Sequence, residues 1–213
     1  MKPISPESQI AAYPAATPDG KTIVFLLMNA GKPNLWRMDI DGGNLKQLTD
    51  SNFDGYPQIA PDNKTIVFIG MHGGKDVLKR MTLDGGTPTV LLDRSVAAPA
   101  ISPDGKAVAF GIANQELKQW QIGLVPIEGG PMRTLNYPRP YTRWAPDGKS
   151  LTYVDTTNGV SNVWAQPISG GPAKQITNFT SDKINWFDWS RGGRLAIERG
   201  NSSSDVVLLR PGK

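Results

Sequence analysis

The sequence predicts an all-β protein, a five-bladed β-propeller built from four-stranded antiparallel blades. The first observation is a turn motif, Pro-Asp-Gly-Lys or a close variant, whose first four copies are spaced 43, 42 and 43 residues apart. A degenerate fifth copy follows after 45 residues, and the copies stand at residues 18–21, 61–64, 103–106, 146–149 and 190–194. A constant period of this size is typical of repeat architectures. The second observation is that no segment shows a sustained helical apolar period, so we expect almost no helix.

The first repeat contains four strand-like segments in a fixed order. They are residues 13–17, 22–27, 34–39 and 46–49. The Pro-Asp-Gly-Lys turn joins the first two, because proline presets φ and glycine accepts the positive φ that other residues resist. The second segment is rich in β-branched and aromatic residues, and the third alternates apolar and polar residues, as expected for a buried and a half-buried strand. A hairpin turn, Asp-Gly-Gly at residues 41–43, precedes the short fourth segment.

The later repeats keep the same order. Their second strands are predicted at residues 65–68, 107–110, 151–154 and 195–197, and their fourth strands at residues 88–91, 133–135 and 174–177. Four short antiparallel strands in each repeat predict the blades of a propeller. The blades are expected at residues 12–50, 51–93, 94–136, 137–178, and 179–213 together with 1–6, as one domain over residues 1–213.

The two ends of the chain are complementary. The last repeat reaches its third strand at residues 205–209 and lacks a fourth, whereas residues 2–5 followed by 12–14 parallel residues 46–49 followed by 55–57. We therefore predict that residues 2–5 complete the fifth blade, which removes an unpaired strand edge and leaves a monomer. The alternative is a piece of a larger ring, since such a fragment would show the same period.

Composition excludes several classes of function. The 213 residues carry a net charge of +4 and no cysteine. Disulfides, thiol catalysis and cysteine metal sites are therefore excluded, but a periplasmic or otherwise extracytoplasmic location and a cytoplasmic one both stay open. The basic residues are scattered, which favours a solvated surface over a nucleic-acid interface. No stretch approaches the ~20 apolar residues of a membrane helix.

No catalytic or metal-binding constellation is recognisable. The single histidine, His72, lies in a loop, and no Gly-x-Ser-x-Gly elbow accompanies it. The aspartates of the turn motif recur because such a side chain bonds its own backbone. They are Asp19, Asp62, Asp104 and Asp147. We expect no catalytic residue, no metal and no cofactor.

The repeat as a whole resembles the TolB-like propeller repeat, a relative of WD repeats. The resemblance rests on residues 18–25, on Leu-Trp-x-Met-Asp-x-Asp-Gly-Gly at residues 35–43 and on Lys-Gln-Leu-Thr at residues 46–49, and it covers essentially the whole chain. It implies a platform that binds proteins or ligands. Residues 187–190 and 204–209 also resemble the last blade of propellers attached to bacterial sensor proteins. The kinase or winged-helix motifs of those proteins are not in this sequence, so neither activity is transferred.

Candidate binding residues are those that depart from the repeat. The innermost strands place Ala15, Gln58, Ala100, Arg143 and Asp188 at one equivalent position near the channel. Small residues there serve packing, so Gln58, Arg143 and Asp188 are candidates. Arg143 and Asp188 fall on neighbouring blades, where they could form an interior ion pair or contact a ligand.

Variable loops on one face supply further candidates. Tyr137, Arg139, Tyr141 and Trp186 lie in these loops and are of the residue types favoured in recognition hot spots. Trp186 has no evident equivalent in other repeats, and we expect it to be exposed. The other tryptophans match one another and are expected to pack. Trp144 and Trp189 occupy the same position of their repeats and are expected to pack between blades. Trp36 and Trp164 are equivalent to each other on third strands, and Trp120 is expected to be their counterpart.

These observations predict a non-enzymatic binding or scaffold propeller with one recognition face for a protein or peptide partner or a small ligand. Such a propeller could be the sensing end of a larger bacterial protein. Two alternatives stay open. The chain could be the accessory propeller of a peptidase or another enzyme, or a trimmed or engineered minimal propeller without retained function.

Overall fold

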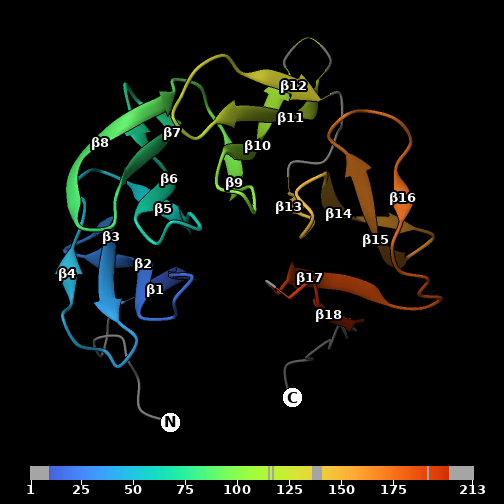
Figure 1. Cartoon of the computed structure of the whole chain (residues 1–213), viewed down its shortest axis with the longest axis horizontal. Helices are drawn as coiled ribbons and strands as arrows, with labels where there is room; N and C mark the ends of the chain where they lie inside the picture. Colours follow the sequence, from blue (N-terminus) through green and yellow to red (C-terminus); the bar gives the residue numbers. More distant parts are fainter. Residues whose placement is uncertain (1–9, 115, 117, 136–140, 191, 202–213) are drawn as a thin grey trace, which may run out of the picture.

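The computed structural model describes residues 10–114, 116, 118–135, 141–190 and 192–201. These residues form four four-stranded antiparallel sheets and one two-stranded sheet, and no helix occurs among them. The sheets follow one another in chain order around an open arc (Figure 1). The prediction of an all-β protein made of antiparallel four-stranded sheets is confirmed.

Each four-stranded sheet is a simple meander, with strands adjacent in space in their order along the chain. The first sheet contains β1 (Ala11–Ala16), β2 (Thr22–Asn29), β3 (Lys32–Asp39) and β4 (Lys46–Gln47). The second contains β5 (Asp54–Ile59), β6 (Thr65–His72), β7 (Lys75–Thr82) and β8 (Gly85–Leu92). The third contains β9 (Ala97–Ile101), β10 (Ala107–Asn114), β11 (Gln119–Pro126) and β12 (Arg133–Leu135).

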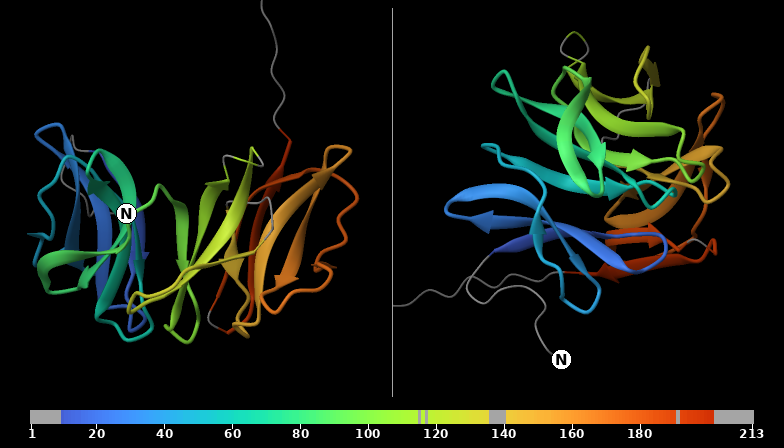
Figure 2. Two further views of the ribbon diagram at one scale, coloured as in Figure 1. Left: turned by 90° about the horizontal axis from the view of Figure 1, so that it is seen from above. Right: turned by 60° about the vertical axis from the view of Figure 1, so that its left-hand side comes forward.

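The fourth sheet contains β13 (Arg143–Trp144), β14 (Ser150–Thr157), β15 (Val160–Pro167) and β16 (Lys174–Gln175). The fifth contains β17 (Lys183–Trp189) and β18 (Leu195–Gly200). The first strand of each sheet faces the centre of the arc and the fourth strands lie on its outer rim (Figure 1). Two further views show the sheets standing side by side, so that each has its neighbours in the chain as its neighbours in space (Figure 2).

The repeated turn is held by its aspartate, as predicted. In the third sheet Ser102 Oγ and the amide of Lys106 donate hydrogen bonds of 2.6 and 3.0 Å to Asp104 Oδ1. These two hydrogen bonds, the one from Ser102 foremost, lower the pKa of Asp104 below its ordinary value. Gly105 has φ +72°, and a Cβ there would lie 3.1 Å from Pro61 of the preceding turn. The turn motif therefore recurs for structural reasons.

Apolar cores lie between consecutive sheets. Phe68 of the second sheet packs with Val24 of the first, and Phe110 of the third sheet packs with Val67 of the second. Two tryptophans add hydrogen bonds across such interfaces. Trp144 Nε1 donates to the carbonyl of Ala100 at 3.0 Å. These contacts confirm that Trp144 packs between sheets.

Trp189 behaves in the same way one sheet further on. Its indole Nε1 donates to Thr152 Oγ1 of the fourth sheet at 3.0 Å, and its ring lies against the cluster formed by Val163 and Phe187. The predicted role of Trp189 in packing between sheets is therefore also confirmed.

The prediction that Trp120 is the counterpart of Trp36 and Trp164 is wrong. Trp36 pairs with Phe25 across the first sheet and Trp164 pairs with Tyr153 across the fourth, but the equivalent partner of Phe110 is Gly123. A Cβ at Gly123 would lie 2.2 Å from the Phe110 ring, so this ring occupies the space that an indole fills elsewhere.

The predicted closing strand, residues 2–5, and the last predicted strand, residues 205–209, lie outside the described residues. The first sheet carries a separate apolar cluster that includes Phe25, Leu27 and Met38. In the second sheet the corresponding face, with Phe68, packs on the preceding sheet. The number of blades and the closure of the ring therefore stay predictions.

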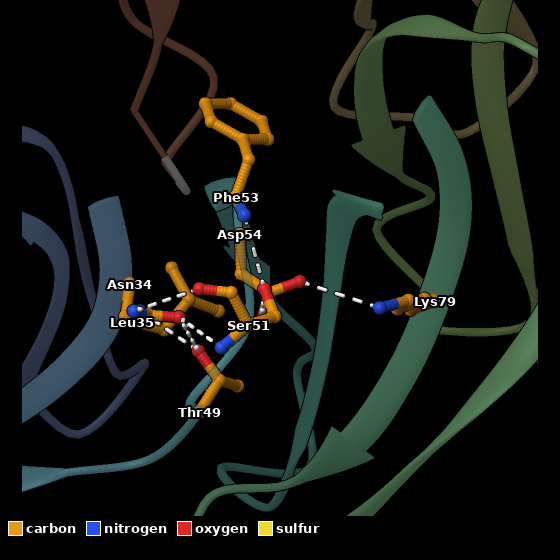
Figure 3. Close-up of polar contacts among 7 residues, drawn as sticks. All are labelled: Asn34, Leu35, Thr49, Ser51, Phe53, Asp54 and Lys79. Carbon is orange, nitrogen blue, oxygen red and sulfur yellow. Dashed lines mark hydrogen bonds and ion pairs between the residues drawn. The ribbon is translucent and has the colours of Figure 1, made fainter. Parts of the chain in front are cut away.

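An asparagine–threonine clamp holds the segment that leads from the first sheet to the second (Figure 3). Asn34 Oδ1 accepts hydrogen bonds from the amide of Ser51 at 2.8 Å and from Thr49 Oγ1 at 3.3 Å, and its Nδ2 donates to the carbonyl of Ser51 at 3.3 Å. Thr49 Oγ1 in turn accepts from the amide of Leu35 at 3.0 Å. Because Asn34 and Thr49 are buried, the clamp fixes the start of the next innermost strand.

The fourth sheet contains the same clamp. Asn162 Oδ1 accepts from the amide of Phe179 at 2.7 Å and from Thr177 Oγ1 at 2.9 Å, and Nδ2 donates to the carbonyl of Phe179 at 3.2 Å. The amide of Val163 donates to Thr177 Oγ1 at 2.9 Å. Asparagine and threonine are 15 residues apart in both clamps. The threonine of the Lys-Gln-Leu-Thr segment thus has a structural task that its sequence alone did not reveal.

We expect Asn34→Ala to lower the free energy of unfolding by about 2–3 kcal/mol, because it leaves buried backbone and hydroxyl groups without partners. Urea unfolding followed by circular dichroism measures this change. Asn29→Ala is the matched control, since Asn29 is exposed at the end of β2, and it should stay within about 0.5 kcal/mol of the wild type. Equal effects of the two substitutions would contradict the role assigned to the clamp.

Candidate functional site

The register of the sheets confirms the shared position of the five residues near the channel. Each pairs with the same position on the second strand of its sheet. The pairs are Ala15–Val24, Gln58–Val67, Ala100–Ala109, Arg143–Thr152 and Asp188–Ala196. All five lie on innermost strands, which face the centre of the arc (Figure 1).

Arg143 and Asp188 are brought together, as the sequence predicted. Arg143 Nε lies 3.8 Å from Asp188 Oδ1, and the Arg143 side chain is 25% exposed whereas that of Asp188 is 60% exposed. The guanidinium also lies over the ring of Trp186, with Cζ 4.8 Å from the ring centroid. Burial lowers the pKa of Arg143, and the charge of Asp188 acts in the opposite direction. The result is a half-buried cation held beside an aromatic ring.

A pocket of about 400 Å³ opens beside this cation, between the innermost strands β13 and β17. Three predicted binding residues, Tyr141, Arg143 and Trp186, line it. The other lining residues are Thr142, Val154, Ile184, Asn185 and Phe187. Thr142 is 1% exposed, and its hydroxyl has no hydrogen-bond partner within the described part of the chain. The pocket thus combines apolar walls with a cation and a buried hydroxyl.

Exposed aromatic side chains recur two residues before the shared position. They are Tyr13, Tyr56, Tyr141 and Trp186, which are 47%, 38%, 69% and 56% exposed, with Ala98 in the third sheet. They account for four of the nine large exposed hydrophobic side chains of the described residues, so they are not scattered exceptions. Trp186 is exposed as predicted, but the statement that it has no equivalent is wrong.

The signal for this row was present in the sequence. Tyr13, Tyr56 and Tyr141 each stand five residues before the proline of a turn motif. The tyrosines differ from Trp186 in residue type, so matching identical residues between repeats does not reveal the row.

The backbone at these positions is unusual. Tyr13, Tyr56 and Ala98 have φ values of +54°, +55° and +47°, at register shifts in β1, β5 and β9. The left-handed region disfavours a residue with a side chain by roughly 1–2 kcal/mol. A β-bulge redirects a side chain away from its alternating position. The bulges therefore aim the aromatic side chains in a direction that a regular strand would not allow.

Two of the aromatic rings stack. The centroids of Tyr13 and Tyr56 are 4.2 Å apart, and the Tyr56 hydroxyl donates to that of Tyr13 at 3.2 Å. This hydrogen bond, followed by burial and by the negative charges of ionised Tyr13 and Tyr141, raises the pKa of Tyr56 to about 12. The two rings therefore meet between the innermost strands β1 and β5. We call Tyr13, Tyr56, Tyr141, Trp186 and Arg143 the central aromatic site.

The remaining predicted residues are less informative. Gln58 does not line the pocket, and its Nε2 donates to the carbonyl of Pro57 at 3.0 Å. Tyr137 and Arg139 lie outside the described residues. His72 is exposed at the end of β6.

In the part of the chain that the structure describes, no cluster of three or more histidine, aspartate or glutamate side chains could hold a metal ion. None of the segments in that part forms a helix with the length and apolar character needed to cross a membrane.

A buried ion pair that the sequence did not reveal lies at the start of β5. Lys79 Nζ lies 3.4 Å from Asp54 Oδ1, and the two side chains are 11% and 1% exposed (Figure 3). Ser51 Oγ donates to the other carboxylate oxygen at 2.8 Å. Gly70 leaves room for the pair, since a Cβ there would lie 2.0 Å from Asp54 Oδ1. Asp54 begins β5, the strand that carries Tyr56, so the pair anchors the start of that strand.

Comparison with known proteins identifies the fold. No family model matches the chain. It is 19% identical to a putative TolB from Agrobacterium tumefaciens, with a TM-score of 0.76 over 93% of this chain and 73% of that one. It is 15% identical to the β-propeller domain of the Trilobed protease from Pyrococcus furiosus, which has an open velcro topology, with a TM-score of 0.62 over 90% of this chain and 64% of that one. The chain has a TolB-like β-propeller fold.

Two sequence relatives match about half of the chain. One is the Tricorn protease homolog 1 of Streptomyces coelicolor, 31% identical over 106 residues, and the other is an uncharacterized protein of Agrobacterium fabrum, 30% identical over 112 residues. These alignments cover 46% and 52% of this chain, but only 9% and 38% of the two relatives. The chain therefore spans a minor part of the length of either relative.

We expect Lys79→Ala to lower the free energy of unfolding by about 3–5 kcal/mol, because it leaves the carboxylate of Asp54 buried and unpaired. The double variant Asp54→Val with Lys79→Leu should recover most of this loss, since apolar side chains can replace a buried ion pair. Urea unfolding of the wild type and both variants measures the three values. A loss below about 1 kcal/mol for Lys79→Ala would show that the pair is not needed.

Proposed function

We propose that this chain is a non-enzymatic binding propeller that recognises a protein, a peptide or a small ligand at the central aromatic site. The observation that carries the proposal is that exposed aromatic rings stand at equivalent positions of the first, second, fourth and fifth sheets. One half-buried cation, Arg143, lies over the ring of Trp186. Tyrosine, tryptophan and arginine are the residues that dominate binding energy in recognition sites. The adjoining pocket of about 400 Å³ has the apolar walls and few polar groups of a ligand site.

The chemistry of the site supports binding rather than turnover. A hydrolytic mechanism needs a nucleophile, a base and a group that orients the base within hydrogen-bond reach. The only histidine of the chain, His72, stands at the β6–β7 hairpin and does not line the pocket. Arg143 and Asp188 can hold a charged or polar group, and the residues that line the pocket include no histidine, serine or cysteine.

A second candidate function is that of an accessory propeller in a peptidase. It is favoured by the likeness to the Trilobed protease propeller and by the sequence match to the Tricorn protease homolog. In such a protein another domain would carry the catalytic residues, and the central aromatic site would not select a ligand by itself.

We further propose that the fold is a ring of five blades, closed when residues 2–5 pair as the fourth strand of the last blade. The apolar face of the first sheet, which includes Phe25, Leu27 and Met38, supports this proposal. It corresponds to the face that packs on a preceding sheet elsewhere in the arc.

To test the binding function, a random peptide library is selected on the immobilised chain. We expect selected sequences to bind the wild type and to lose at least about tenfold in affinity for Trp186→Ala, because truncating a hot-spot aromatic costs ~2 kcal/mol or more. Trp120→Ala is the control, since Trp120 is 40% exposed and lies on β11, outside the site.

The outcome against the proposal is selection of peptides that ignore Trp186, or selection of none. The accessory-propeller alternative would then be preferred, and the chain would be studied together with a catalytic domain.

Ring closure is tested by light scattering across a concentration series. We expect the full chain to remain a monomer of 23.1 kDa and a variant without residues 1–5 to self-associate, because an unpaired strand edge recruits other chains. If both proteins are monomers of equal stability, residues 2–5 do not close the ring.

A further inference from the structure

We propose that the ligand of the central aromatic site is an extended, proline-containing peptide segment with an acidic side chain among its prolines. This inference rests on the proposed binding function and names its ligand class. It rests on the row of exposed aromatic side chains, on the incomplete pairing of Arg143 with Asp188 and on the extent of the pocket.

The aromatic row suits a polyproline II segment. Such a segment has no internal hydrogen bonds, so its carbonyl groups remain free to accept them, and it is already extended before binding. Proline rings dock on grooves lined with aromatic side chains. Tyr13, Tyr56, Tyr141 and Trp186 are exposed and offer aromatic surface. The hydroxyls of Tyr13 and Tyr141 and the indole of Trp186 can donate to a ligand, whereas the Tyr56 hydroxyl already donates to Tyr13. One row thus provides both the stacking surfaces and the donors that this backbone needs.

The polar groups of the pocket select an acidic side chain. The 3.8 Å between Arg143 Nε and Asp188 Oδ1 is longer than a hydrogen bond, so Asp188 balances the charge without fully engaging the guanidinium. A ligand carboxylate can bind an arginine with two parallel, charge-assisted hydrogen bonds. Thr142 lines the same pocket, and its buried hydroxyl, which has no hydrogen-bond partner among the described residues, is a further donor there. A cationic ligand is disfavoured, because Arg143 already occupies the face of Trp186.

A ligand that uses the whole central aromatic site continues beyond the pocket, because the stacked tyrosines lie outside it. A volume of about 400 Å³ lies in the range of small-ligand sites. The stacked pair Tyr13–Tyr56 does not line the pocket. A ligand confined to the pocket would leave this pair unused, whereas an extended segment can fill the pocket and lie across the pair.

The test uses the full, isotopically labelled chain and three capped heptapeptides. The first has a glutamate in the centre of six prolines, the second has glutamine in place of the glutamate, and the third keeps the glutamate but replaces all prolines by glycine. Titrations are followed through the Trp indole N–H resonances. We expect the glutamate–proline peptide to bind about tenfold more tightly than the glutamine peptide, as a charge-assisted hydrogen bond predicts. The glycine peptide should show no saturable shift.

Protein variants provide the second arm of the test. Arg143→Gln should abolish the preference for glutamate over glutamine. Asp188→Asn should increase the affinity for the glutamate–proline peptide relative to that for the glutamine peptide, because it removes the carboxylate that competes for Arg143. Trp120→Ala, a matched exposed tryptophan outside the site, should change neither affinity.

The inference is overturned if the glutamate and glutamine peptides bind equally, if no peptide binds, or if a tri-uronate oligosaccharide shifts the Trp186 indole resonance and the peptides do not. The last result would assign the site to an acidic glycan. Failure of this inference is distinguishable from failure of the proposed function: library peptides of another composition that depend on Trp186 would preserve the binding function and reject only the ligand class.

Discussion

One constraint shapes the whole molecule: each sheet can bury its apolar faces only against the sheets beside it in the chain. The clusters around Phe68 and around Phe110 are each shared by two consecutive sheets, and Trp144 and Trp189 reach across the next two interfaces. Stability in such an arrangement is close to a sum of terms for single repeats and for neighbouring pairs. This is why positions that meet a neighbour repeat faithfully, down to the stacking of Gly105 on Pro61.

Positions on the innermost strands are under less of this constraint. Their residues border the centre of the arc, and register shifts in β1, β5, β9 and β17 interrupt the ladder there. The aromatic side chains at these shifts lie outside the apolar cores between the sheets, although Tyr13 and Tyr56 contact each other across the first and second sheets. The backbone of Tyr13 and of Tyr56 is in the left-handed region, so these two rings are held at some cost in backbone strain.

The sequence predicted those features that depend on position within the repeat. The turn aspartates, the packing of Trp144 and Trp189 and the meeting of Arg143 with Asp188 follow from counting along the period. Features that depend on how side chains of neighbouring strands fill the space between them were not predictable. Trp120 was misplaced because Gly123 yields its space to Phe110, and the buried Asp54–Lys79 pair depends on the room at Gly70. The aromatic row was countable, but its importance follows only from exposure and from the positive φ values.

The charges of the site contribute little to folding, which agrees with the proposed binding function. A partly exposed ion pair contributes roughly 0–1 kcal/mol to folding, and the 3.8 Å separation of Arg143 and Asp188 is too long for a hydrogen bond. Burial of Arg143 acts against its charge, as the direction of its pKa shift shows. Alanine occupies the same position in the first and third sheets, so the fold does not require a charge there. A cation kept half-buried beside Trp186 at a cost to folding is the arrangement that a ligand carboxylate would complete.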